Sequence, residues 1–204
     1  MSFITPLLQI VSSFIIDVIS SLGYTGIAIL MAIESANIPL PSEIIMPFAG
    51  FLAFQQKFSL VLVALAGAIG NVAGSTISYL IGFYGGRPFI LKYGKYILIT
   101  KKELEHGEKW FKKHGSSSAF ISRLFPIIRT FISLPAGIAK TDIKKFTFYT
   151  FLGSFIWSYF LAFIGFKLGE NWNSIAHYFR NFDFLIVIII LLAAFLFWRR
   201  HRKK

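Results

Sequence analysis

Two glutamates and two arginines interrupt segments of this sequence that are otherwise apolar. Glu34 and Glu43 begin and end the string ESANIPLPSE, and Arg123 and Arg129 lie in SRLFPIIR. The whole chain has only nine acidic residues. A charge at the centre of a bilayer costs about 2.5 to 3.5 kcal/mol on translocon scales, so we expect these four side chains to pair with one another or to face a shared water-filled cavity.

The two residue types suit different parts of anion binding. The guanidinium group of arginine stays charged, and its planar donors fit phosphate or carboxylate, so Arg123 and Arg129 are predicted to bind a phosphate group. A glutamate takes up a proton more readily when it leaves water, which makes Glu34 and Glu43 the predicted proton-coupling residues. Two other interpretations stay open. Ser42 and Glu43 also fit a capped helix N-terminus, and both arginines also suit structural ion pairs with the glutamates.

Four prolines are predicted to break helices beside these charges. Proline removes a backbone donor and clashes with the preceding turn of a helix. Backbone groups freed in this way are tolerated inside a membrane only where protein or water satisfies them, so the breaks are expected to line a cavity. The predicted hairpin breaks are Pro39, Pro41, Pro126 and Pro135.

The elements that hold these residues are expected to lie in a membrane. Hydrophobic residues make up 55% of the 204 residues and the mean hydropathy is +0.66, above the roughly 45 to 50% apolar content of ordinary globular chains. The net charge of +12 is unevenly distributed, with eight basic residues between Arg87 and Lys113 and five between Arg199 and Lys204. Because basic residues are retained on the cytoplasmic side, this charge predicts a cytoplasmic C-terminus rather than nucleic-acid binding. No cysteine is present, which excludes disulfides and thiolate metal sites.

The two halves of the sequence share a pattern that predicts an internal repeat. Each half has three glycines with spacings of twelve and four residues, namely Gly70, Gly82 and Gly86 and then Gly153, Gly165 and Gly169. The string Pro47-Phe-Ala-Gly50 likewise resembles Pro135-Ala-Gly137. In each half, two apolar segments shorter than the roughly 20 residues of a spanning helix precede one that is long enough. Only one complete crossing separates the two hairpins, so the repeat is predicted to be inverted, as in many transporters.

The predicted fold is therefore an all-α membrane protein in one domain. It is an inverted repeat of two re-entrant helical hairpins, each followed by a transmembrane helix, with an N-terminal amphipathic helix and a C-terminal transmembrane helix. The predicted segments are an amphipathic helix at 3–22, hairpin 1 at 24–55, a transmembrane helix at 59–86, a cytoplasmic amphipathic linker at 87–114, hairpin 2 at 115–139, transmembrane helices at 142–169 and 182–199, and a basic tail at 200–204. A tilted spanning helix is the alternative for residues 3–22.

Several of these strings resemble motifs of the bacterial DedA family, part of the wider VTT (SNARE-associated Golgi) superfamily, and the resemblance covers nearly the whole chain. It is carried by Glu34 with Pro39-Leu-Pro-Ser-Glu43, Pro47-Phe-Ala-Gly50, Gly82-Phe-Tyr-Gly-Gly-Arg87, Phe120-Ile-Ser-Arg123-Leu-Phe-Pro126-Ile-Ile-Arg129, and Pro135-Ala-Gly137 followed by Phe146, Gly153 and Trp157. One departure is Thr141, where the family's usual methionine is expected.

The resemblance implies a lipid translocase of the bacterial cytoplasmic membrane, with essential embedded residues at Glu34, Glu43, Arg123 and Arg129. The function it implies is a flippase that carries undecaprenyl phosphate across the membrane for carrier-lipid recycling in cell-wall synthesis, coupled to the proton motive force. The expected partners are a polyprenyl phosphate or phospholipid substrate, protons and membrane lipids, with a homo-oligomer left open. No enzyme activity, cofactor, metal ion or nucleic acid is expected.

Three alternatives accompany this prediction. The chain could carry another phospholipid such as phosphatidylethanolamine, or it could be a proton-coupled ion antiporter, because pairs of acids and arginines serve ion coupling equally well. A membrane-bound lipid phosphatase is disfavoured, since none of the four histidines lies within the predicted hairpins.

Overall fold

The computed structural model describes residues 4–38, 40–93, 105, 109–111, 115–125 and 128–169. Over these ranges the chain is helical and has no strand, which confirms the all-α prediction. The chain divides into two compact units, Met1–Lys167 and Leu168–Lys204, and the helices below belong to the first. The predicted transmembrane helix 182–199 and the basic tail 200–204 lie outside the described residues, as does most of the predicted linker 87–114.

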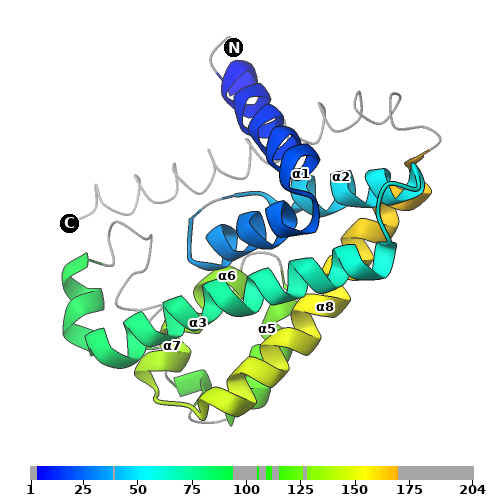
Figure 1. Ribbon diagram of the computed structural model, residues 1–204. Coiled ribbons are helices and arrows are strands. Elements are labelled where there is room, and N and C mark those ends of the chain that lie inside the picture. Colours follow the sequence, from blue (N-terminus) through cyan, green and yellow to red (C-terminus); the bar gives the residue numbers. More distant parts are fainter. Residues whose placement is uncertain are drawn as a thin grey trace. The chain divides into compact units, whose positions relative to one another are not determined.

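Two long helices, α3 (Leu60–Tyr93) and α8 (Ile143–Lys167), lie side by side at the centre of the first unit (Figure 1). Their windows Leu60–Gly86 and Ile143–Lys167 are long and apolar enough to cross a membrane. These windows agree with the helices predicted at 59–86 and 142–169. The helical run of α3 continues past a break at Gly86, whose φ of 60° is accessible to glycine at little cost.

A third candidate span, Val11–Ser35, belongs to α1 (Ile4–Ser35). This helix is bent at Gly23, whose φ of 59° and ψ of −133° are not helical, so α1 consists of two arms (Figure 1). The bend falls between the predicted amphipathic helix 3–22 and the predicted hairpin arm that starts at residue 24. That the first arm lies along the membrane surface stays a prediction, with a tilted spanning helix as the alternative.

The other helices are short. They are α2 (Ser42–Phe54), the 3-10 turn η2 (Gly115–Ser117), α5 (Ser118–Arg123), α6 (Ile128–Phe131) and α7 (Ser133–Ile138). The second arm of α1 and α2 together form a helical hairpin. In the stretch predicted as hairpin 2, α6 and α7 lie on either side of Ile132, whose φ of −65° and ψ of −24° keep the backbone helical. The re-entrant character of both hairpins remains a prediction.

The prolines differ in what they do. Pro41 immediately precedes α2 in an extended conformation, as a helix-breaking residue should. Pro135 lies inside α7, in its first turn, and so does not itself end a helix. A proline there is tolerated because the N–H groups of the first turn have no partner within that helix. Pro39 and Pro126 lie outside the described residues.

In each half of the chain, a short helix packs against the long helix of the other half. α2 packs mainly against α8, and α7 packs against α3. A Cβ atom at Gly50 would lie 1.9 Å from the Ala162 carbonyl oxygen, and one at Gly137 would lie 2.0 Å from the Tyr79 carbonyl oxygen. Only glycine permits such contacts, because real Cβ atoms essentially never come within 3.0 Å of a neighbour.

These two glycine contacts correspond to each other under the predicted repeat. Gly50 and Gly137 end the similar strings that suggested it, and Tyr79 and Ala162 each lie three residues before the glycines matched there, Gly82 and Gly165. Those glycines make reciprocal contacts of the same kind. Cβ atoms there would lie 2.4 Å from the Leu134 oxygen and 1.9 Å from the Pro47 oxygen, respectively.

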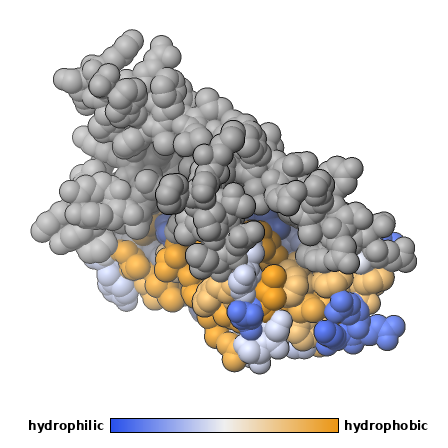
Figure 2. Space-filling view, turned by 90° about the horizontal axis from the view of Figure 1, so that it is seen from above, coloured by the Kyte–Doolittle hydropathy of each residue, from blue (hydrophilic) through white to orange (hydrophobic). Residues whose placement is uncertain are grey.

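The outward faces of the long helices are apolar, and much of the described surface visible in Figure 2 is hydrophobic. The exposed large side chains of α3 and α8 include Ile69, Ile77, Phe148, Ile156 and Phe160. Buried polar residues lie on the inward faces instead, among them Asn71, Ser75 and Ser78 of α3 and Thr150, Ser154 and Ser158 of α8. Apolar outside and polar inside is the distribution expected of helices whose solvent is lipid.

Candidate functional site

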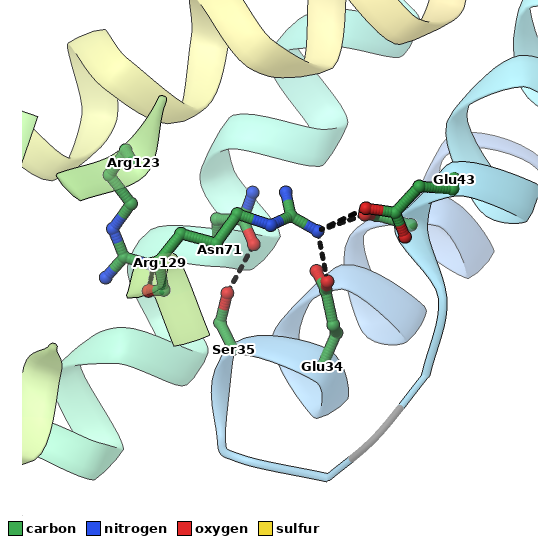
Figure 3. Close-up of polar contacts among 7 residues, drawn as sticks. Glu34, Ser35, Glu43, Asn71, Arg123 and Arg129 are labelled. Atoms are coloured by element: carbon green, nitrogen blue, oxygen red, sulfur yellow. Dashed lines mark hydrogen bonds and ion pairs between the residues drawn. The ribbon is translucent and has the colours of Figure 1, made fainter. Parts of the chain in front are cut away.

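The four charged residues singled out in the sequence come from four different helices. Glu34 is the second-last residue of α1, Glu43 the second residue of α2, Arg123 the last of α5 and Arg129 the second of α6. Each lies at or near a helix end, where the chain turns, so helices too short to span can still bring charges together. Figure 3 shows the Arg129 guanidinium group pointing toward Glu34 and Glu43, whereas Arg123 points away from both.

Arg129 forms the centre of a buried ion cluster. Its Nη2 forms an ion pair with the Glu34 carboxylate and also donates a hydrogen bond to the Ser42 hydroxyl oxygen. The Glu43 carboxylate is 3.9 Å from the same nitrogen. The Glu34 and Arg129 side chains are only 5% and 4% exposed, whereas Glu43 is 41% exposed. The cluster therefore extends from a buried carboxylate to one within reach of the surroundings.

Arg123 is equally buried but has only neutral partners. Its guanidinium donates to the backbone oxygen of Arg129 at 2.6 Å, to Ser75 Oγ at 2.6 Å and to Ser133 Oγ at 2.8 Å. No carboxylate in the described part of the chain forms an ion pair with it. A buried charge without a counter-ion is costly, so Arg123 is the group in this site that most needs an anion.

The structure corrects the capping interpretation of Ser42. The residue that precedes α2 as its N-cap is Pro41, and no side chain makes a capping hydrogen bond there. The Ser42 hydroxyl accepts from Arg129 instead. Glu43 is in the first turn of α2, where a negative charge suits the helix dipole, so helix stabilisation and membership of the ion cluster coexist at this residue.

Several neutral residues of the site escaped prediction. Ser35 donates to Asn71 Oδ1, and Ser78 donates to the Ser35 backbone oxygen at 3.2 Å. With Ser75, these residues fix the end of α1 and the guanidinium of Arg123 against α3. A signal was available, since Asn71, Ser75 and Ser78 follow a helical spacing of four and three residues and so share one face of an apolar helix.

The aromatic ring of Trp157 lies beside the guanidinium group of Arg129. Arg129 Cζ lies 5.4 Å from the Trp157 ring centroid, within the range of a cation–π interaction. Within the ranges given above, no three His, Cys, Asp or Glu side chains form a group that could hold a metal ion. What the arrangement offers chemically is two fixed guanidinium groups, one already neutralised by Glu34 and one not.

Comparison with known proteins places most of this site within a recognised domain. The VTT domain matches residues 40–167, a range that includes Glu43, Arg123, Arg129 and Trp157. No solved structure matches the chain.

Three relatives illustrate the range of names carried by similar proteins. An uncharacterized membrane protein of Bacillus subtilis, YkoX, is 39% identical over 93% of this chain and 83% of its own. Undecaprenyl phosphate transporter A of the same organism is 35% identical over 91% of this chain and 92% of its own. An alkaline phosphatase-like protein of Lactococcus lactis is 35% identical over 86% of this chain and 85% of its own.

Proposed function

We propose that this chain, which belongs to the VTT-domain family and is a DedA-family membrane protein, is a lipid transporter that carries undecaprenyl phosphate across the bacterial cytoplasmic membrane. Its role would be to recycle the lipid carrier of cell-wall synthesis. The substrate is suggested by the relative named undecaprenyl phosphate transporter A, which aligns with nearly all of the chain. The cytoplasmic C-terminus predicted from the basic residues belongs to the same proposal.

The observation that carries the proposal is the buried, uncompensated charge of Arg123. This side chain is 2% exposed, and its hydrogen-bond partners among the described residues are all neutral groups. A phosphate that enters the site would supply the missing counter-ion, and the planar guanidinium would hold two of its oxygens. Arg129 is the second phosphate-binding residue in the proposal, although its first partner is Glu34.

Proton coupling follows from competition for Arg129. A phosphate that draws Arg129 toward itself would weaken its ion pair with Glu34 and leave a buried carboxylate without a partner. Such a carboxylate is relieved of its charge most simply by taking up a proton. Glu43 is the accessible group of the cluster, so in this scheme it passes the proton between Glu34 and the surroundings.

The predicted inverted repeat and re-entrant hairpins supply the means of movement. The matched glycine contacts of α2 on α8 and of α7 on α3 support the repeat. In transporters built this way, one repeat rocks against the other around a substrate site that stays at their interface. The ion cluster draws Glu34 and Glu43 from the first half and Arg129 from the second, as an interface site requires.

The test is transport of undecaprenyl phosphate in liposomes that contain the purified protein. Wild type is compared with Arg123→Gln, Glu34→Gln and the control Ser21→Ala, whose hydroxyl is exposed and bonded within its own helix. We expect a large loss of transport in both site variants and none in the control. An imposed proton gradient is expected to accelerate wild type but not Glu34→Gln.

Each alternative function has its own readout in the same vesicles. Movement of phosphatidylethanolamine but not of undecaprenyl phosphate would make phosphatidylethanolamine the transported lipid. Proton flux without any lipid movement would indicate an antiporter. Release of inorganic phosphate would indicate a phosphatase, a function suggested by two Lactococcus lactis relatives named alkaline phosphatase-like protein. We expect no phosphate release.

A further inference from the structure

The inward face of α8 carries hydroxyl groups that have no hydrogen-bond partner within the described residues. They belong to Thr150, Ser154 and Ser158, which are at most 1% exposed. A hydroxyl in a helix usually bonds to the carbonyl oxygen one turn earlier. Thr76 and Ser122 do so, at 2.7 and 2.8 Å. The hydroxyls of α8 are different, and buried polar groups of this kind need a partner from elsewhere.

The register of α3 against α8 places this face beside the polar face of α3. A Cβ at Gly67 would meet Ser158 Oγ at 2.9 Å, and twelve residues further along α3, the ring of Tyr79 is 5.1 Å from that of Phe146. The two helices therefore run antiparallel. One and two turns from Ser158, this register places Ser154 level with Asn71 and Thr150 level with Ser75.

Arg123 lies at the same level. Ser75 accepts one of its hydrogen bonds, and a Cβ at Gly153 would lie 2.7 Å from the Arg123 Cβ. The first carbons of the Arg123 side chain thus lie against α8 at Gly153, the residue before Ser154. Trp157, one turn beyond Gly153, lies against the guanidinium of Arg129. Both arginines therefore contact α8 at residues that adjoin two of the three hydroxyl-bearing positions.

Three further unpartnered atoms in this region can only donate. They are the Nε atoms of Arg123 and Arg129 and the Nε1 atom of Trp157, which have no partner in the described ranges. The three hydroxyls can donate as well as accept, and Glu34 Oε2 is the unpartnered carboxylate oxygen here. A ligand whose oxygens accept can take a hydrogen bond from each of these donors and from each hydroxyl. A phosphate group is such a ligand.

We propose that this face of α8, formed by Thr150, Ser154, Trp157 and Ser158, is a phosphate-binding surface that completes the site begun by the two arginines. The inference rests on the proposed function, because it takes the ligand to be a phosphate monoester. The three hydroxyls succeed one another at one-turn intervals over about 12 Å. A phosphate held by Arg123 can therefore exchange one hydroxyl for the next as it moves along α8.

The test is binding of farnesyl phosphate to purified protein in detergent, measured by calorimetry. Thr150→Val, Ser154→Ala and Ser158→Ala each remove one hydroxyl, and Trp157→Phe removes the indole N–H. We expect each change to weaken binding about tenfold, as for the loss of one hydrogen bond to a charged group. Thr76→Val and Ser122→Ala are matched controls, because their hydroxyls are bonded within their own helices, and are expected to bind like wild type.

Two further binding measurements identify the ligand, and one variant controls for misfolding. Inorganic phosphate that binds as tightly as farnesyl phosphate would make free phosphate the ligand, while farnesol should not bind at all. Thr150→Ser keeps a hydroxyl and should retain the wild-type affinity that Thr150→Val loses. A loss shared by both Thr150 variants would indicate a packing role and overturn the proposal.

The outcomes separate this inference from the proposed function. If the hydroxyl variants bind farnesyl phosphate like wild type, the α8 surface is refuted while transport by the arginine site still stands. If they keep their affinity but lose proton uptake in vesicles, the hydroxyls conduct protons and the phosphate surface is refuted. Absence of binding by wild type itself would refute both.

Discussion

At the scale of single residues, the two arginines predicted as equivalent turn out to be in different electrostatic situations. Arg129 shares its charge with Glu34 and, at 3.9 Å, with Glu43. Arg123 has three neutral acceptors. The sequence could show that both charges need compensation in an apolar segment, but not which of them receives it, because partner choice depends on where α5 and α6 end.

The Glu34–Arg129 pair leads to a first prediction. Arg129→Gln leaves the buried Glu34 carboxylate without its ion-pair partner, and Glu34→Gln leaves Arg129 with only the more distant Glu43; each should cost about 3 to 5 kcal/mol of folding stability. The double variant should lose clearly less than the sum, because the charge that remains in the cluster is the partly exposed Glu43. Unfolding by SDS titration in detergent micelles measures all three. Additive losses would contradict a direct interaction between the two side chains.

A second prediction concerns Asp142, which immediately precedes α8. Its carboxylate accepts from the backbone N–H groups of Lys144 at 2.9 Å and Lys145 at 3.1 Å. Chiefly through the bond from Lys145, these contacts lower the pKa of Asp142. A lowered pKa in the folded state means that the ionised carboxylate stabilises the helix at neutral pH, and that this contribution is lost as the pH falls through the folded-state pKa.

Thermal unfolding of Asp142→Ala should show this directly. At neutral pH the variant should unfold at a lower temperature than wild type, and the difference should shrink once the pH falls below the usual aspartate pKa of about 3.9. Asp142→Asn retains an acceptor without the charge and should be intermediate at neutral pH. A difference that is constant with pH would show that the charge of Asp142 plays no part.

At the scale of elements, the exchange of short helices between the halves depends on four glycines. Gly50→Ala and Gly137→Ala would each place a methyl group about 2 Å from a backbone oxygen of the facing long helix, which cannot move aside as a flexible side chain could. We expect both to lower the yield of folded protein and the unfolding temperature, and to similar degrees. Ala73→Leu adds more bulk at an exposed position of α3 and is the control. A severe effect in only one of the glycine variants would argue against equivalent contacts.

The elements show what the sequence could and could not predict. The cores of α3 and α8 were predictable, because a long apolar run can lower its free energy in lipid only as a helix. The helical position of Pro135 was not, since it depends on how α7 packs against α3. The hydroxyls of α8 also gave no signal, because serine and threonine in apolar helices ordinarily satisfy themselves within the helix.

At the scale of the whole molecule, orientation is the prediction that decides the direction of any transport. The distribution of basic residues predicts that residues 87–114 and the C-terminus lie on the cytoplasmic side. A fluorescent protein fused after Lys204 should therefore fluoresce, and an alkaline phosphatase reporter at the same place should be inactive. The opposite pair of results would invert the topology, and the sides from which both predicted hairpins enter would be exchanged.

The crossed glycine contacts have a consequence for how the polypeptide comes together. α2 packs against α8, which is synthesised much later, and α7 packs against α3, which is synthesised much earlier. Each half of the chain therefore lacks a packing partner that the other half supplies. A chain cut between residues 94 and 104 would give two fragments, each holding the surface that the other lacks. Co-expressed, they should reassemble into an active protein, and either fragment alone should be degraded. Reassembly would show that the packing of the two halves on each other does not require the peptide link between them.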